Sequence, residues 1–275
     1  MQKTICCKGR LVSLEKPLVM GILNVTEDSF YDGGEHLHNY LQHTEQLLAE
    51  GADIIDVGFV STRPGAREMS EDEELKKCDK ILGDLIKKFP NILFSLDTWR
   101  ASVARLGIHM GAAIINDVSG GMFDPAMFDT VAELQVPYIL MHTTGKPDVM
   151  QQQTQYKDFI KDIYYYLSQR IDNLRMRNVK DIIVDLGFGF GKTLEQNYRL
   201  LHELPTFQSL DCPILVALSR KSMLYKLTGG TPAEALPATI AANTLALQQG
   251  ANLLRVHDVK AAKEAIAVWE AYCKN

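Results

Sequence analysis

The chain lacks the features that mark membrane, secreted and nucleic-acid-binding proteins. Its 275 residues contain no apolar run close to the ~20 residues that a membrane-spanning helix needs. The opening sequence, MQKTICCKGRLVSLEKP, lacks the longer apolar region of a secretory signal. With 29 basic and 34 acidic side chains, the net charge of −5 offers no general attraction to nucleic acid or to an acidic membrane. We therefore expect a cytoplasmic protein that has neither nucleic acid nor membrane as a partner.

Paired cysteines and linkers are also missing. The 5 cysteines are scattered and form no C-x-x-C pair, which indicates reduced thiols in a cytoplasm. No low-complexity tract, basic tail or linker divides the chain, and its apolar fraction of 46% is ordinary for a globular protein. The length suits one large α/β domain, so we expect a single domain over residues 1–275.

What the sequence does contain is a series of short apolar runs that predict β-strands. Each run neighbours a segment with apolar residues at three- and four-residue spacing, which predicts a helix. Eight such repeats in this length favour a (β/α)8 barrel (TIM barrel), and a doubly wound open sheet is the alternative. The predicted strands are Leu18–Asn24, Asp53–Gly58, Ile92–Asp97, Ala113–Asp117, Tyr138–His142, Ile182–Asp185, Ile214–Ser219 and Leu253–Asp258.

Two of the predicted helices have distinctive compositions. Ala235–Gln249 is rich in alanine and leucine, which predicts a helix with a tightly packed face. The acidic run Glu71–Glu74 begins another helix, where the helix dipole favours acids, and predicts a solvated first turn.

Polar side chains stand where most of these strands end. In a (β/α)8 barrel the carboxyl ends of the strands meet at one mouth, and ligands bind there. Alternate strand residues face the same way, so Arg255 and His257 can share a side of the last strand. The strand ends that this reasoning brings together are Asn24, Asp56, Asp97, Asn116, His142, Asp185, Ser219, Arg255 and His257.

The residues of this predicted mouth fall into two chemical sets. Asp97, Asn116 and Asp185 are acceptors, and a carboxylate can accept two parallel N–H bonds from a guanidine-like edge. The cationic or donor set is Arg63, Lys221, Arg255 and His257, which suits an anion such as a diphosphate. The two sets together predict a ligand with a cyclic amide and amine head and a negative tail.

One stretch, Asp181–Thr193 (DIIVDLGFGFGKT), joins a buried strand to a glycine-spaced turn. It is not a P-loop, because Leu186 occupies a position that must be glycine. It is not a dinucleotide-binding turn either, because Lys192 occupies the last glycine position. What remains is an acid at a strand end, Asp185, which is either a ligand-binding group or a helix cap or core hydrogen-bonding group.

Taken together, the motifs resemble the dihydropteroate synthase family over nearly the whole chain and in the right order. The segments that carry the resemblance are Met20–Gly34 (MGILNVTEDSFYDGG), Ser61–Ala66 (STRPGA), Ile115–Gly121 (INDVSGG), Asp185–Thr193 (DLGFGFGKT), Ser219–Ser222 (SRKS) and Arg255–Val259 (RVHDV). The resemblance implies a usually dimeric (β/α)8 barrel. It also implies the joining of p-aminobenzoate to 6-hydroxymethyl-7,8-dihydropterin diphosphate, with release of diphosphate, in folate synthesis.

The resemblance also implies a role for particular residues. Pterin would be bound by Asp97, Asn116, Asp185, Lys221 and Arg255, with Met141 packed on its ring. Diphosphate would contact Asn24, Thr62, Arg255 and His257, with Mg²⁺ bound through Asn24. The p-aminobenzoate pocket would involve Thr62, Arg63, Pro64, Phe190, Lys221 and Ser222. The residues implied in catalysis are Arg63, Asp97, Lys221, Arg255 and His257.

The chain departs from the family pattern at several positions beside these residues. Glu27 and Leu186 stand where proline is common, Phe59 and Val60 where Gly-Glu is common, and Thr144 where arginine is common. These departures bear on the loops and on p-aminobenzoate more than on pterin. Two alternatives stay open: a related pterin-binding barrel that handles a methylated folate for a corrinoid protein, and a non-catalytic homologue that binds pterin or a partner protein.

Overall fold

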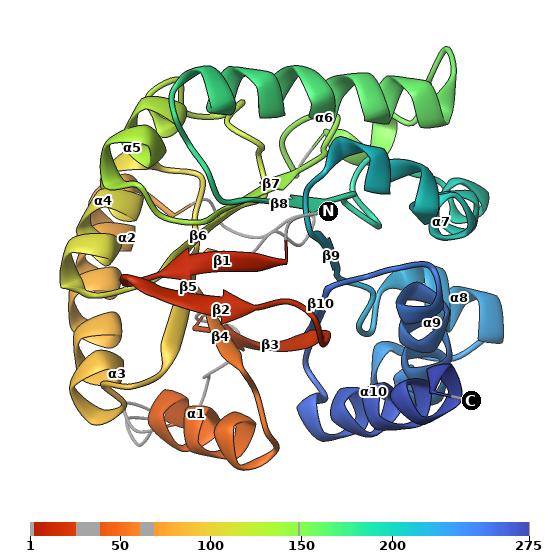
Figure 1. The fold of residues 1–275 in the computed structure, drawn as a ribbon, viewed down its shortest axis with the longest axis horizontal. Helices are drawn as coiled ribbons and strands as arrows, with labels where there is room; N and C mark the ends of the chain where they lie inside the picture. Colours follow the sequence, from red (N-terminus) through yellow and green to blue (C-terminus); the bar gives the residue numbers. More distant parts are fainter. Residues whose placement is uncertain (1–2, 26–38, 61–68, 148, 275) are drawn as a thin grey trace.

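The computed structural model describes residues 3–25, 39–60, 69–147 and 149–274, and its centre is a closed barrel of eight parallel strands (Figure 1). The strands run in the order β10-β3-β4-β5-β6-β7-β8-β9. This closure confirms the barrel and excludes the open sheet. The barrel strands are β3 (Leu18–Asn24), β4 (Ile54–Gly58), β5 (Leu93–Asp97), β6 (Ile114–Asp117), β7 (Tyr138–Met141), β8 (Ile182–Asp185), β9 (Ile214–Val216) and β10 (Leu253–Val256).

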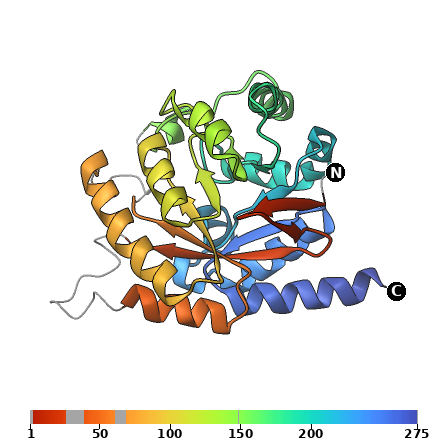
Figure 2. The same cartoon turned by 60° about the vertical axis from the view of Figure 1, so that its left-hand side comes forward.

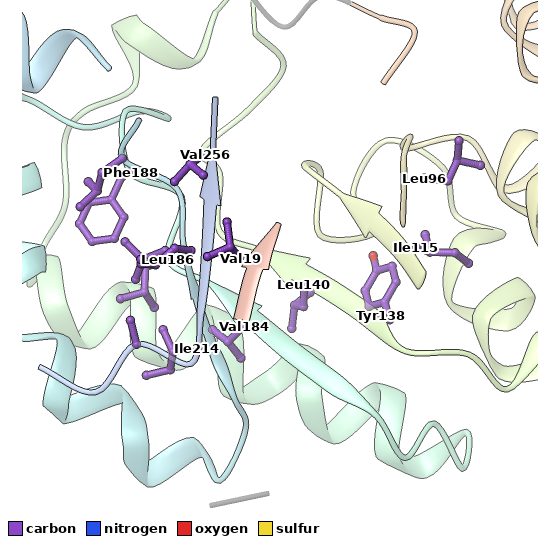
Figure 3. Close-up of a cluster of buried hydrophobic side chains, with 14 of the residues drawn as sticks. Val19, Leu96, Ile115, Tyr138, Leu140, Val184, Leu186, Phe188, Ile214 and Val256 are labelled. Carbon is purple, nitrogen blue, oxygen red and sulfur yellow. The ribbon is translucent and has the colours of Figure 1, made fainter. Parts of the chain in front are cut away.

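Helices surround the barrel and bury the outward faces of its strands. Figure 3 shows part of this apolar layer, from Val19 on β3 to Val256 on β10. The helices are α1 (Asn39–Ala49), α2 (Glu71–Lys77), α3 (Gly83–Lys88), α4 (Ala101–Met110), α5 (Met127–Leu134), α6 (Phe159–Met176), α7 (Leu194–His202), α8 (Ser222–Thr228), α9 (Leu236–Gln248) and α10 (Val259–Cys273). A π-helix, η3 (Cys78–Leu82), joins α2 to α3, and short 3-10 helices are η4 (Met150–Gln152), η5 (Leu204–Leu210) and η6 (Pro232–Glu234).

An antiparallel hairpin that the sequence patterns did not predict precedes the barrel. Its strands are β1 (Thr4–Cys7) and β2 (Arg10–Ser13). Figures 1 and 2 show the hairpin lying across one end of the barrel. Ile5, Cys7 and Leu14 are buried in the same apolar cluster as residues from the first halves of the barrel strands, such as Ile54 and Ile183. The hairpin therefore fills the amino end of the barrel, and the carboxyl end is left for a ligand.

The barrel interior changes from apolar to polar along the strands. Ile54, Ile114, Ile139, Ile183 and Leu253 belong to the apolar cluster near the amino end. Because alternate residues of a strand face the same side, the next inward position lies two residues further on. Those positions hold Asp56, Asn116, Met141, Asp185 and Arg255. The polar layer of the barrel therefore follows from the alternation of side chains along each strand, with the apolar layer at the amino end and the polar layer two residues further on.

The acidic start of α2 differs from the sequence-based prediction. Ser70 and Glu73 form a capping box, as expected for a solvated first turn. Glu74, however, is only 1% exposed, and it forms an ion pair with Arg100 and accepts a hydrogen bond from Thr98 Oγ1 at 2.7 Å. The prediction was wrong for Glu74, because that side chain faces the strand–helix junction after β5 and pairs with a partly buried cation, Arg100, there.

Among the described residues, no helix is both long enough and apolar enough to cross a membrane.

Candidate active site

Arg255 on β10 reaches across the barrel interior to carboxylates on β4 and β5. Its Nε donates to Asp56 Oδ2 at 2.6 Å and its Nη2 donates to Asp97 Oδ2 at 2.8 Å. Burial acts to lower the pKa of Arg255, but Asp56 and Asp97 outweigh it and the pKa is raised. Burial raises the pKa of Asp97 to about 7, with Arg255 acting in the opposite direction. The guanidinium is therefore held as a cation between two acids.

The side-chain amide of Asn116 joins this network from β6. Its Nδ2 donates to Asp56 Oδ2 at 2.9 Å, so one carboxylate oxygen accepts from both Asn116 and Arg255. Asn116 is 3% exposed and Asp56 is fully buried. The sequence placed Asp56 at the mouth but gave it no role. Its two bonds make it the acceptor that links β4, β6 and β10.

Asp185, the last residue of β8, and Lys221, which directly precedes α8, form a second charged group. Asp185 Oδ1 accepts from the backbone N–H of Gly187 at 2.7 Å. Lys221 Nζ donates to the carbonyl oxygen of Phe188 and lies 4.9 Å from the centre of the Phe190 ring. Burial raises the pKa of Asp185 and lowers that of Lys221 to about 8, and each group opposes the shift of the other. The turn after β8 thus places an acid, a cation and an aromatic ring together.

Lys192 holds the turn after β8 through hydrogen bonds to its backbone. Its Nζ donates to the carbonyl oxygens of Gly187 at 2.8 Å and Phe190 at 2.9 Å, and it lies 2.9 Å from His142 Nδ1. Burial lowers the pKa of both Lys192 and His142 well below their ordinary values. His142, which we expected at the mouth, is therefore a buried partner of Lys192. The partial match of Asp181–Thr193 to a P-loop includes Lys192, which binds phosphate in a true P-loop. Here Lys192 binds backbone carbonyl oxygens, which the sequence alone could not indicate.

Two contacts fasten the end of β10 to the turn after β9. Ser219 Oγ accepts from the backbone N–H of His257 at 3.2 Å and lies 3.0 Å from its Nδ1. Arg220 has a φ of 55° and bonds both carboxylate oxygens of Asp258, at 2.9 and 2.6 Å. Because a non-glycine residue rarely adopts this left-handed conformation, the bidentate pair helps to hold it. Lys221 and His257 are both positioned by these neighbours.

Asn24, the last residue of β3, is exposed at the carboxyl end of the barrel. Gly58 lies beside both Asn24 and Asp97. If Gly58 had a Cβ, that atom would lie 3.3 Å from Asn24 Oδ1 and 3.5 Å from Asp97 Oδ2, so the absence of a side chain there leaves space between the two oxygens. Hard oxygen donors of this kind suit Mg²⁺. Among the residues that the structure describes, no three His, Cys, Asp or Glu side chains are grouped to hold a metal.

The structure brings most of the residues singled out in the sequence to this end of the barrel. Arg255, Asp97 and Asn116 are joined through direct bonds or through Asp56, and Met141 is buried in the same inward layer. Ser222 is exposed at the first position of α8. Thr62, Arg63, Pro64 and Glu27 lie outside the described residues. Acceptors and cations therefore share one site, which can bind a polar ring and an anion together.

The described departures from the family pattern are accommodated by packing. Phe59 and Leu186 are fully buried in the apolar layer between strands and helices. Thr144 lies against the turn after β8, because a Cβ at Gly191 would come within 1.9 Å of Thr144 Oγ1. Phe59 and Leu186 thus pack between the barrel strands and the helices, and Thr144 packs against the turn after β8.

Comparison with known proteins gives one consistent result. The family model described as pterin binding enzyme matches residues 20–257. The chain is 40% identical over 268 residues to the dihydropteroate synthase of Escherichia coli K12, covering 96% of this chain and 94% of that one. Its fold is similar to that of Xanthomonas albilineans dihydropteroate synthase with 4-aminobenzoic acid (TM-score 0.92, 38% identity, 100% of both chains). It is also similar to the complex of that enzyme with 7,8-dihydropteroate (TM-score 0.88, 36% identity, 99% of both chains).

Proposed function

Because the chain belongs to the dihydropteroate synthases of the pterin-binding enzyme family, we propose that its barrel mouth carries out their reaction with the residues described above. The chain is a transferase of folate biosynthesis that condenses 6-hydroxymethyl-7,8-dihydropterin diphosphate with p-aminobenzoate. The observation that carries the assignment of residues is the shared network of Arg255, Asp56, Asp97 and Asn116 beside Asp185 and Lys221.

The inward layer supplies the groups that a pterin ring needs. The ring carries an amide, an amine and ring nitrogens, and its N–H groups would donate to the carboxylates of Asp97 and Asp185 and to Asn116. Lys221 and Arg255 would donate to the acceptor atoms of the ring. Met141, buried at the end of β7, would pack on the ring face. Binding a ring in this layer would give partners to acids whose pKa is raised by burial.

The charged groups at the rim would then stabilise the departing diphosphate. The bond between the pterin methylene carbon and the diphosphate oxygen breaks, and diphosphate keeps the electron pair. The amine nitrogen of p-aminobenzoate forms the new C–N bond and loses a proton to water or phosphate. Arg255 and His257 would neutralise the negative charge that develops on the leaving group. When bound by Asn24 and phosphate oxygens, Mg²⁺ would supply further positive charge to the same group.

The binding site for p-aminobenzoate would lie over the bound pterin. Phe190, Lys221 and Ser222 are close in the structure, because the Lys221 ammonium lies over the Phe190 ring and Ser222 follows it in the chain. The ring of Phe190 offers an aromatic contact and Ser222 a hydroxyl to a carboxylate. Thr62 and Arg63 complete the proposed pocket, with a role that stays a prediction.

The pH dependence of the reaction should report Asp97 and Lys221. The pKa of Asp97 is raised to about 7, so its carboxylate is present above that pH, and the pKa of Lys221 is lowered to about 8, so its ammonium is present below that pH. Both charged forms are needed for binding. Plotted against pH, kcat/KM for the dihydropterin diphosphate should therefore rise through about 7 and fall through about 8, because kcat/KM reports the free enzyme.

Initial rates between pH 5.5 and 10 would give this profile. Lys221→Arg should remove the fall at high pH, because a guanidinium stays charged throughout the range. A profile for the unaltered protein that stays level between pH 8 and 10 would contradict the assignment of Lys221.

The activity itself is tested by diphosphate release. Purified protein is supplied with the dihydropterin diphosphate, p-aminobenzoate and Mg²⁺, and diphosphate is measured over time. Diphosphate release that depends on p-aminobenzoate would support the synthase reaction. Loss of that release when EDTA is added would support a requirement for Mg²⁺. Tight pterin binding without release would favour the non-catalytic homologue. Release that does not need p-aminobenzoate would overturn the proposed reaction.

Three broader expectations stay predictions. A homodimer is supported by apolar side chains exposed on the last two helices, Leu245 on α9 and Val268 and Tyr272 on α10, and sedimentation would test it. A cytoplasmic location is supported by five cysteines that are all free. A single domain over residues 1–275 is supported by a barrel whose strands extend from Leu18 to Val256.

A further inference from the structure

Asp56 is the most buried charged group of the site, and the reaction described above gives it no contact with a substrate. It is fully buried, and its Oδ2 is the acceptor that Arg255 and Asn116 share. Its other oxygen, Oδ1, is buried and has no hydrogen-bond partner among the described residues. A buried oxygen without a partner weakens folding, so fold stability alone does not account for a carboxylate at this position.

The contact with Asp56 decides which end of the Asn116 amide faces the ligand. An ionised carboxylate only accepts hydrogen bonds, so the group that faces Asp56 must be the NH2 of Asn116. The amide oxygen is therefore turned the other way. No side chain or backbone group among the described residues donates to that oxygen. Asn116 is thereby presented as an acceptor, and a flipped amide would present a donor instead.

The same carboxylate fixes the plane of the Arg255 guanidinium. Nε is held by Asp56 and Nη2 by Asp97, two acceptors on adjacent strands. A planar guanidinium bonded at these two nitrogens cannot rotate. Within the described part of the chain, its Nη1 has no acceptor, which leaves that nitrogen as the donor available to a ligand.

We propose that Asp56 is a positioning residue that sets the amide orientation of Asn116 and the plane of Arg255, and thereby makes this edge of the site selective for a ring N–H donor. The proposal rests on the proposed pterin site and adds to it a residue that touches no substrate. Removal of Asp56 should weaken pterin binding by removing the contribution of Asn116, rather than by unfolding the protein.

A double-mutant cycle with Asp56→Leu and Asn116→Ala tests this coupling. The probe is 6-hydroxymethyl-7,8-dihydropterin diphosphate with Mg²⁺, and its Kd is measured by calorimetry well below the unfolding temperature of each variant. In the otherwise unaltered protein, Asn116→Ala should raise Kd at least about tenfold, the scale of a lost buried hydrogen bond. In the Asp56→Leu background it should change Kd by less than about twofold, because the amide is no longer oriented. Equal effects in the two backgrounds would overturn the proposal.

Asp56→Asn separates orientation from charge. Its amide oxygen can still accept from Asn116 and Arg255, so Kd should stay within about threefold of the unaltered protein while stability falls. If Asp56 acted through its charge alone, Asp56→Asn would bind as weakly as Asp56→Leu. Asp53→Asn is the matched control, because Asp53 directly precedes the same strand and binds Val19 N and Lys263 at its other end. It should leave Kd unchanged.

A measurement on the unaltered protein covers the case in which Asp56→Leu does not fold. The side-chain NH2 protons of Asn116, assigned by their loss in Asn116→Ala, should exchange with water much more slowly than those of an exposed asparagine. Exchange as fast as that of an exposed side-chain amide would overturn the proposal whether or not pterin binds. If the unaltered protein fails to bind the pterin probe, the proposed function is wrong. If it binds the probe but the effects of Asp56→Leu and Asn116→Ala on Kd are additive, only the role proposed for Asp56 is wrong.

Discussion

Replacement of Arg255 by methionine should destabilise the protein and abolish useful activity. The change removes the cation that lies between Asp56, which is fully buried, and Asp97, which is partly buried, and leaves both carboxylates without an ion-pair partner. Breaking a buried ion pair from one side costs about 3–5 kcal/mol of the free energy of unfolding. Since Arg255 is also assigned to the ring and to the departing diphosphate of the pterin substrate, kcat/KM should fall at least about 100-fold, as for a lost stabiliser of developing charge.

The loss of stability in Arg255→Met should depend on pH in a defined direction. Arg255 lowers the pKa of Asp97, so without it that pKa rises further above about 7. A carboxyl group whose pKa is raised in the folded state binds more protons than in the unfolded state. The free energy of unfolding should therefore fall as pH rises from about 4, the ordinary value for Asp, through the raised pKa. Urea titrations at pH 5.5 and 8.5 would measure the difference.

Arg105→Met provides the matched control for this substitution. Arg105 pairs with Glu133 at 2.6 Å on the surface, where both side chains are accessible to water. Exposed ion pairs contribute little to stability. The control should therefore leave the urea midpoint and kcat/KM nearly unchanged. If Arg255→Met behaved like Arg105→Met, the network of Arg255, Asp56, Asp97 and Asn116 would contribute little to stability or activity.

Gly187→Ala should produce the second large effect, through the backbone of the turn after β8. Gly187 has a φ of +68°, and a Cβ there would lie 1.9 Å from the carbonyl oxygen of His142. An L-residue in the left-handed region costs about 1–2 kcal/mol, and the contact with backbone cannot be relieved by a rotamer change. The free energy of unfolding should fall by more than that conformational cost, to a loss of about 3 kcal/mol or more.

Gly187→Ala should also raise the KM for the pterin substrate. The N–H of Gly187 donates to Asp185, and the carbonyl oxygen of the next residue, Phe188, accepts from Lys221. A shift of the turn would move both charged groups. Gly229→Ala is the control, because Gly229 has a φ of +72° and no atom within 4 Å of its added Cβ. Chemical denaturation of both variants would measure the contribution of the contact with the His142 carbonyl oxygen. If the two variants lost the same free energy of unfolding, that contact would have no effect.

The sequence predicted the barrel because the strand signal was strong. Runs such as Leu18–Asn24 and Ile182–Asp185 are short, apolar and end in a polar residue, and their predicted bounds coincide with β3 and β8. The runs at Ile214 and Leu253 were predicted too long, because β9 and β10 stop before the turn residues. The β1–β2 hairpin was not predicted, because four-residue strands at a chain end have too few positions to establish a period of two.

The candidate site could be predicted as a set of residues but not as a network. Period-two patterning placed Asp97, Asn116 and Arg255 at one end of the barrel. It could not show that Arg255 bonds Asp97 directly and meets Asn116 through Asp56, because side-chain reach across a barrel depends on rotamers and strand tilt. Glu74 was misread for the same reason. Whether an acid in a first turn faces water or, like Glu74, an arginine is decided by contacts between residues that are far apart in the sequence.

The apolar hairpin at the amino end has a kinetic consequence. Because the described side chains of Ile5, Cys7 and Leu14 fill that end, we expect substrates and products to exchange at the opposite end. A pterin seated in the deep polar layer lies below any p-aminobenzoate that arrives later. The second substrate would then block the exit of the first. We therefore expect the pterin diphosphate to bind before p-aminobenzoate, and the joined product to vacate the barrel before another pterin can take its place.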